Sequence, residues 1–136
     1  MAHPNEELLR KGYEAFAAGD LAALDTMFAD DILWHNGGNN ALSGDYHGKE
    51  AVFGFFGRVL ELTGGNFRND VHTMFADDEH GVVVVNLHAE RDGRTFDSPA
   101  VHVLHVADGK VTEFWGLVYD TRGSDEFWGP KEAATA

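Results

Sequence analysis

Three tight-turn signals divide the second half of this 136-residue sequence into four strand-like runs. The first turn is at residues 77–81, and the other two are the Asp-Gly pairs at 92–93 and 108–109. Asp-Gly between apolar or alternating segments is a strong hairpin signal, because a type I′ turn requires positive φ at both central residues. The segments between the turns are rich in Val, Phe, Trp and Tyr, which favour strands. The pattern therefore predicts a curved antiparallel meander over residues 67–119.

The first part of the sequence has the periodicity of helices. Leu9, Tyr13 and Phe16 recur at i, i+4 and i+7, which predicts one apolar stripe on a helix. Asn5 is expected to cap this helix, with two glutamates in the first turn that suit the positive end of the helix dipole. Asp20 is expected to cap a short second helix.

A third helix is predicted over residues 49–62, where apolar side chains again repeat at helical spacing and a Gly-Gly pair follows. A short strand is predicted at residues 32–35, and the polar, glycine-rich stretch 36–48 is expected to form a loop. Because this helical material precedes the strand meander, the order predicts an α+β fold. Three N-terminal helices then lie on one face of a curved sheet.

The composition limits the kinds of partner that this chain can have. It contains no cysteine, which excludes disulfides and thiolate metal sites. No apolar run is long enough to span a bilayer, and the N-terminus lacks the pattern of a signal peptide. The formal net charge of −13 repels phosphate backbones and anionic membranes. We therefore expect a single cytoplasmic domain over residues 1–136, with no nucleic-acid or membrane partner.

The alternation within the meander separates an inner face from an outer face. Val83, Val85 and Leu87 share a wholly apolar face, which is expected to lie against the helices, and His102 and Leu104 share the same side of the next run. The outer face also carries apolar residues, so we expect a second subunit to cover it in a homodimer. The outer apolar set is Val82, Val84, Val101, Val103, Trp115 and Leu117.

Five short motifs are spread over nearly the whole chain in a characteristic order: AAGDL at 17–21, FADD at 28–31, WH at 34–35, YHGKEAV at 46–52 and DGKVTEFW at 108–115. Together they resemble the SnoaL-like, ketosteroid-isomerase-related branch of the NTF2-like superfamily. The resemblance implies a cone, in which a curved antiparallel sheet wraps around three N-terminal helices with an internal apolar pocket. It also implies a homodimer through the sheet. The same fold serves isomerases, polyketide cyclases, epoxide hydrolases, dehydratases and non-enzymatic binders.

The resemblance also allows catalytic positions to be compared one by one. The tyrosine on the first helix of ketosteroid isomerase corresponds to Gly12 here, beside Tyr13. Its general-base aspartate corresponds to Asn36, and its protonated oxyanion-hole aspartate to His102. The acid/base aspartate of SnoaL-type cyclases corresponds to Gly116. All of these positions are changed, so ketosteroid isomerase activity itself is not expected.

His102 is the strongest catalytic candidate that remains. It is the one strongly polar side chain on an otherwise apolar inner face, and imidazole titrates near neutral pH unless it is perturbed. A general acid/base acting on a carbonyl, enol or epoxide is one interpretation, with Asn36 or Tyr13 as the hydrogen-bond donor. The other is a neutral core histidine, bonded to a backbone carbonyl or to Tyr13.

The remaining pocket residues follow from strand parity and from the helix stripes. Trp34 and His35 lie on opposite sides of a short strand, so only one of them easily faces the cavity, and parity leaves the choice open. His102 and His105 point to opposite faces, which argues against a metal site, and no cofactor is expected. The predicted substrate-binding residues are Phe16, Trp34, His35, Phe56, Val85, Leu87, Leu104, Phe114, Gly116 and Val118.

Three functional hypotheses remain open. The first is a cofactor-independent isomerase, cyclase, dehydratase or hydrolase acting on a small apolar carbonyl, polyketide-like or epoxide substrate. The second is a non-catalytic small-molecule binder that uses the same cavity. The third is a dimerisation module with a filled core. A pocket that contains His102 separates the first two from the third, and turnover that depends on His102 separates the first from the second.

Overall fold

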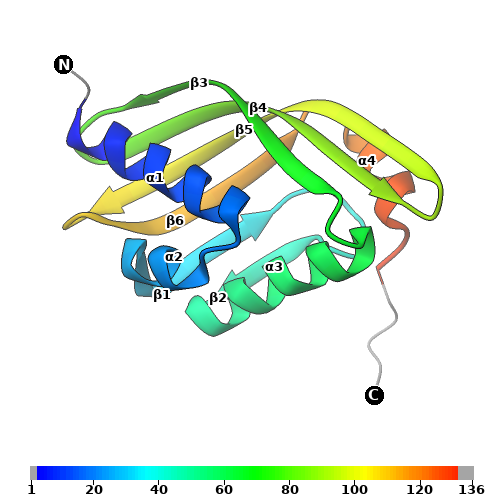
Figure 1. Ribbon diagram of the computed structural model, residues 1–136, viewed down its shortest axis with the longest axis horizontal. Helices are drawn as coiled ribbons and strands as arrows, with labels where there is room; N and C mark the ends of the chain where they lie inside the picture. The colour runs from blue at the N-terminus through cyan, green and yellow to red at the C-terminus, as the bar shows by residue number, and fades with distance from the viewer. Residues whose placement is uncertain (1–2, 132–136) are drawn as a thin grey trace.

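The computed structural model describes residues 3–131, which form an α+β fold with a single six-stranded sheet (Figure 1). The strand order in the sheet is β2-β1-β6-β5-β4-β3. The sheet curves around α1, α2 and α3, and α4 packs at the end of the molecule where the β4–β5 hairpin lies (Figure 1). In chain order the elements are α1 (Pro4–Ala18), α2 (Leu21–Met27), β1 (Phe28–Asn36), β2 (Gly44–His47), α3 (Lys49–Thr63), β3 (Phe67–Ala76), β4 (His80–Arg91), β5 (Arg94–Ala107), β6 (Lys110–Val118) and α4 (Thr121–Trp128).

The two Asp-Gly pairs form the hairpin turns that the sequence predicts. Between β4 and β5, Asp92 has φ of 51° and Gly93 has φ of 76°. Between β5 and β6, Asp108 and Gly109 have φ of 52° and 72°. Positive φ at both central residues is the type I′ pattern, whose twist matches that of the flanking strands. The first turn sets the register of β4 with β5. Between β5 and β6, the register that the second turn begins shifts by one residue at a bulge between His105 and Val106.

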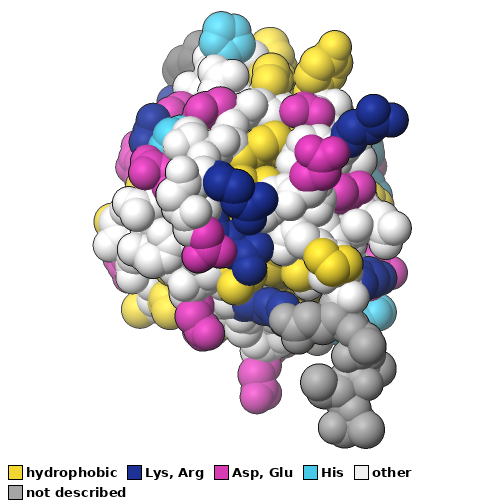
Figure 2. Space-filling model, turned by 90° about the vertical axis from the view of Figure 1, so that its right-hand side faces the viewer, with side chains coloured by type: hydrophobic (Ala, Val, Ile, Leu, Met, Phe, Trp, Pro, Cys, Tyr) yellow, Lys and Arg dark blue, Asp and Glu magenta, His cyan; other side chains and the backbone are white. Residues whose placement is uncertain are grey.

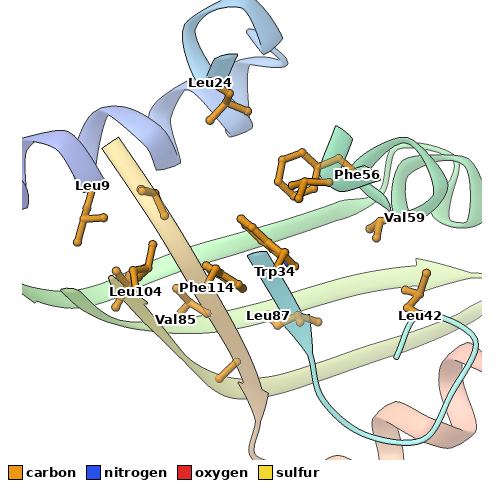
Figure 3. Close-up of a cluster of buried hydrophobic side chains, with 14 of the residues drawn as sticks. Leu9, Leu24, Trp34, Leu42, Phe56, Val59, Val85, Leu87, Leu104 and Phe114 are labelled. Atoms are coloured by element: carbon orange, nitrogen blue, oxygen red, sulfur yellow. The ribbon is translucent and has the colours of Figure 1, made fainter. Parts of the chain in front are cut away.

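The inner face of the sheet has the predicted parity. Val83 and Val85 are fully buried, and Leu87 and Leu104 are only 7% and 4% exposed. Figure 3 shows Val85, Leu87, Leu104 and Phe114 on the strands in one cluster with Leu9, Leu24 and Phe56 from the helices. At the centre of this core the rings of Trp34 and Phe114 stack, with 3.6 Å between their centroids.

The start of α1 differs from the sequence prediction. The cap is His3, whose Nδ1 accepts a hydrogen bond of 3.0 Å from the backbone N–H of Asn5. Pro4 occupies the first helical position, where its missing N–H costs nothing. Asn5 lies within the first turn, and its side-chain amide donates instead to the carbonyl oxygens of Asp77 and Asp78. The predicted cap is therefore wrong by two residues, whereas Asp20 caps α2 as predicted, accepting from the N–H of Ala23.

The sheet also contains pairing that local patterns do not reveal. Residues 44–47 form β2, which pairs antiparallel with β1 where the sequence predicts a loop. β1 runs parallel to β6, with Trp34 opposite Phe114, so the sheet is not antiparallel throughout. Because the partner of β1 lies far along the chain, alternation within a single segment cannot indicate it.

A fourth helix closes one end of the fold. Asp120 caps α4 by accepting from the N–H of Gly123, and the anchors Phe127 and Trp128 are buried. Arg91 donates to the carbonyl oxygen of Trp128 at 2.8 Å, which satisfies an orphan acceptor at the C-terminal end of α4. Figure 2 looks onto this end and shows basic side chains near its centre, with acidic side chains around them. Asp125 ties α4 to the loop after β1, accepting from Asn40 Nδ2 at 2.9 Å.

The outer face of the sheet carries two rows of apolar side chains that cross β4, β5 and β6. Val82, Val103 and Trp115 form one row, because Val103 pairs with both of the others. Val84, Val101 and Leu117 form the second row by the same register, and Leu117 is 53% exposed. We call these six side chains the outer apolar patch. Among residues 3–131, no helix is both long and apolar enough to cross a bilayer.

The turn glycines give a direct test of this architecture. Gly109→Ala is expected to lower the free energy of unfolding by about 1–2 kcal/mol, because its φ of 72° is strained for a residue with a Cβ. Gly54→Ala is the matched control, since a Cβ at Gly54 in α3 meets nothing within 4 Å. That substitution is expected to raise the free energy of unfolding by about 0.5–1 kcal/mol. Urea denaturation of both variants measures the difference, and equal effects would contradict the turn assignment.

Candidate functional site

A cavity of about 130 Å³ lies between the helices and the inner face of the sheet. It is close in size to the cavity, on the order of 150 Å³, that holds a benzene molecule in another protein. Most of its wall is aromatic or aliphatic, and no Asp or Glu of the described chain lines it. The predicted site residues that line this cavity are Tyr13, Phe16, Trp34, Asn36, Phe56, Leu87, His102, Leu104, Phe114, Gly116 and Val118.

Two predicted pocket residues lie elsewhere. Val85 is fully buried in the core but does not line the cavity. His35 lies on the outer side of β1, where its ring stacks on Trp115 and its nitrogens contact Asp45 at 2.6 Å and Glu113 at 2.7 Å. These two hydrogen bonds, the one to Glu113 first, raise the pKa of His35. Trp34 therefore takes the cavity side of the strand, which strand parity left open.

Tyr13 and His102 form a hydrogen-bonded pair in the cavity wall. Tyr13 comes from α1 and His102 from β5, and the hydroxyl of Tyr13 bonds to Nδ1 of His102. The two rings are nearly parallel, with an interplanar angle of 13°. Nε2 of His102 makes no hydrogen bond to any of the residues that the structure describes.

Burial keeps both members of this pair uncharged at neutral pH. The side chain of His102 is only 7% exposed, and this desolvation lowers its pKa to about 4. Burial likewise raises the pKa of the Tyr13 phenol far above its usual value. At pH 7 the pair is therefore a neutral imidazole beside a neutral phenol.

Asn36, Gly116 and His102 lie side by side across three neighbouring strands. Gly116 of β6 pairs with Asn36 of β1 on one side and with His102 of β5 on the other. Gly116 itself has no side chain. A Cβ added there would meet the Phe114 ring at 3.3 Å and Asn36 Oδ1 at 3.4 Å, so these two groups fill the space beside its backbone. The Asn36 amide donates from Nδ2 to the carbonyl oxygen of Leu42 at 3.0 Å, which holds its orientation.

The sequence analysis missed one polar residue of the wall. Asn69 of β3 lines the cavity, and its Oδ1 is buried with no hydrogen-bond partner among residues 3–131. Alternation with Phe67 was the available signal, because the two residues share a strand face and Phe67 also lines the cavity. A lone asparagine in a strand, however, gives no sequence indication that it faces inward.

A smaller cavity of about 60 Å³ adjoins the main one beside α4. It shares Phe55, Phe67 and Leu87 with the main cavity, and Trp128 of α4 closes its far side. Space for a ligand therefore extends from the Tyr13–His102 pair toward α4.

The comparisons with known proteins identify the family and the fold of this chain. The SnoaL-like domain family matches residues 9–114, so the chain belongs to this family, as its motifs predict. Bal32a, from a soil-derived mobile gene cassette, is 34% identical with a TM-score of 0.90, covering 94% of this chain and 98% of Bal32a. An NTF2-like protein of unknown function from Burkholderia pseudomallei is 24% identical with a TM-score of 0.83, covering 93% and 98% of the two chains. The Mycobacterium tuberculosis protein Rv0034, which is uncharacterized, is 28% identical over 123 residues, covering 90% of this chain and 94% of Rv0034. The predicted family and the NTF2-like fold class are thus confirmed.

The lowered pKa of His102 predicts a pH dependence of stability. Between about pH 6.5 and pH 4 the unfolded chain binds a proton at this imidazole and the folded chain does not. Stability from the buried neutral ring is therefore complete above about pH 6.5 and is lost as the pH falls toward 4.

We expect the free energy of unfolding to fall between pH 7 and pH 4.5 by about 2 kcal/mol more in the wild type than in His102→Gln. Urea denaturation at the two pH values measures this difference, with His72→Gln on the exposed face of β3 as the matched control. If His102→Gln and the wild type lose the same stability, His102 is not buried in the neutral form.

Proposed function

We propose that this protein binds a small apolar molecule in its cavity and transfers a proton on it at the Tyr13–His102 pair. It would be a cofactor-independent isomerase, cyclase or hydrolase, acting on a small apolar carbonyl, polyketide-like or epoxide substrate. One observation carries the proposal: two neutral titratable groups from different elements meet in a mostly apolar cavity. Apolar cavities with a few convergent polar groups and shifted pKa values are the usual setting of small-molecule sites.

The pair has two neutral tautomers, and they offer different chemistry. When Tyr13 donates to Nδ1 of His102, Nε2 carries the ring proton and is a donor for a ligand oxygen. When Nδ1 carries the proton and donates to the Tyr13 oxygen, Nε2 is a free base and the phenol O–H is available to the ligand. The second tautomer supplies a general base and a hydrogen-bond donor together, which is what proton abstraction beside a carbonyl requires.

Asn36 would support the oxygen on which charge develops. One N–H of its amide is used by Leu42, and the amide group has a second N–H. Asn36 and His102 flank Gly116 in the register of the sheet, so a ligand oxygen that reaches the second N–H of Asn36 would lie on the same face as His102. Such a donor stabilises an enolate or alkoxide more strongly in an apolar site than it would in water.

The size of the cavity limits the substrate. A space of about 130 Å³ encloses roughly one six-membered ring. A larger, polyketide-like molecule would place one ring beside the Tyr13–His102 pair and extend toward α4 or toward the outside.

A non-catalytic small-molecule binder is the second candidate function. Two observations favour it: no carboxylate of the described chain lines the cavity, and Tyr13 and His102 already satisfy one another. Turnover that depends on His102 separates an enzyme from such a binder.

The proposal includes a homodimer formed through the outer apolar patch. Two rows of Val, Trp and Leu side chains form a contiguous apolar set on one sheet face, and Leu117 among them is 53% exposed. Exposed apolar patches often mark an interface between proteins. We also place the protein in the cytoplasm, because a chain with no cysteine suits a reducing compartment. Neither a nucleic acid nor a membrane surface is part of the proposal.

The test of catalysis is His102→Gln, assayed on a panel of enolisable ketones and small epoxides. Exchange of α-protons for deuterium detects proton abstraction even when no product accumulates. Loss of the acid/base group is expected to lower the rate about 10²–10⁴-fold. His105→Gln, on the outer side of the same strand, is the matched control and should keep the wild-type rate. Full turnover by a folded His102→Gln variant would remove this histidine from the mechanism.

The dimer is tested by light scattering. The wild type should have about twice the chain mass of 14.9 kDa. Leu117→Lys is expected to give the monomer mass by placing a charge in the outer apolar patch. Val71→Lys, at an exposed valine of β3 outside this patch, should leave the dimer intact. A wild type that is monomeric in dilute solution would contradict the proposal.

A further inference from the structure

Asn69 of the cavity wall has a polar atom that is both fully buried and unpaired. Among the side chains of residues 3–131, its Oδ1 is the one such oxygen or nitrogen without a hydrogen-bond partner. By contrast, the Tyr13 hydroxyl bonds to His102, and the Asn36 amide donates to Leu42. An orphan amide oxygen among aromatic and aliphatic neighbours therefore needs its own explanation.

Its energetic cost argues against a purely structural role. A buried polar atom without a partner costs about 1–3 kcal/mol, and native proteins contain few of them. Phe67 and Leu87 beside it are apolar, so an apolar side chain at this position would avoid the cost. A cavity wall that carries such an atom is suited to a ligand that brings the missing donor.

The position of Asn69 in the sheet separates it from the Tyr13–His102 pair. Asn69 pairs with Leu87 of β4, and Leu87 pairs with Ser98 of β5. Ser98 lies four residues before His102 on β5, which corresponds to about 13 Å along the strand. Asn69 is also two strands away from β5. The two polar positions therefore contact different groups of a ligand.

On β3, the residues that line the cavity are Phe67 and Asn69. The register with β4 shifts between Val71 and Thr73, which marks a bulge. Val71 is 40% exposed, while Met74 beyond the bulge is buried. Val71 pairs with Val85 on the inner face but does not line the cavity, so Asn69 is the last cavity-lining residue of β3 before the bulge.

We infer that Asn69 is a specificity-determining residue, whose Oδ1 accepts a hydrogen bond from a hydroxyl group of the ligand. This inference rests on the proposed function and refines its substrate class. The preferred ligand is an apolar ring compound with two polar groups: an oxygen at the Tyr13–His102 end and a hydroxyl group, remote from it, at Asn69. Compounds of the same shape without that hydroxyl lose the second contact and leave the amide oxygen unpaired.

The test uses two probes of matched shape, 4-ethylphenol and 4-ethyltoluene, which differ by a hydroxyl in place of a methyl group. Calorimetry gives the dissociation constants of both probes for the wild type, Asn69→Leu and Asn86→Leu. Asn86→Leu is the matched control, because Asn86 is exposed on the outer side of β4. The preference for the phenol, expressed as the ratio of the two constants, should fall about 2- to 10-fold in Asn69→Leu and stay unchanged in Asn86→Leu.

A second measurement uses the unaltered protein and does not depend on the folding of a variant. The side-chain amide resonances of Asn69 should shift on titration with 4-ethylphenol and remain in place with equal occupancy of 4-ethyltoluene. An unchanged preference in Asn69→Leu, or equal shifts with both probes, would overturn the role of Asn69 while leaving a ligand-binding cavity. If neither probe binds the wild type, the proposed function fails and the inference fails with it.

Discussion

The register of β4, β5 and β6 determines almost everything else in this structure. Each strand places alternate side chains on opposite faces. The type I′ turns at 92–93 and 108–109, together with the bulge between His105 and Val106, determine which residues lie opposite one another. A slip of one residue in β5 would turn His102 to the outer face and bring Val103 inward. The cavity, the Tyr13–His102 contact and the outer apolar patch would all be lost together.

Histidines on the two faces of this sheet experience opposite electrostatic environments. His102 faces an apolar cavity and is held neutral by burial, which lowers its pKa to about 4. On the outer face, hydrogen bonds to Glu90 and Asp97 raise the pKa of His88, as Glu113 and Asp45 do for His35. The outer side thus carries these ionic interactions, whereas the inner side carries the Tyr13–His102 pair, which is neutral at pH 7. This separation is the physical basis for regarding the cavity as a site for acid/base chemistry on an apolar molecule.

Sequence reasoning succeeded where the signal is local and failed where it depends on distant partners. The Asp-Gly turns, the inward set on β4 and β5, and the inward position of His102 follow from turn chemistry and alternation. The parallel pairing of β1 depends on β6, a segment far along the chain. The strand β2 lies in a stretch whose sequence has no clear strand pattern, and it forms by pairing with β1. The cavity side of Trp34 became clear only from packing against Phe114. The orphan oxygen of Asn69 could not be predicted, because a missing partner is a property of the whole cavity and not of one strand.

The neutrality of the Tyr13–His102 pair has a consequence for ionic strength. The chain has a formal net charge of −13, so dissolved ions that screen this repulsion act on the surface and on the folded state as a whole. A phenol hydrogen-bonded to an uncharged imidazole has no net charge for those ions to screen. Dissolved salt therefore acts differently on the two parts of the molecule. It weakens the repulsion between the acidic side chains of the surface, and it leaves the Tyr13–His102 hydrogen bond unchanged.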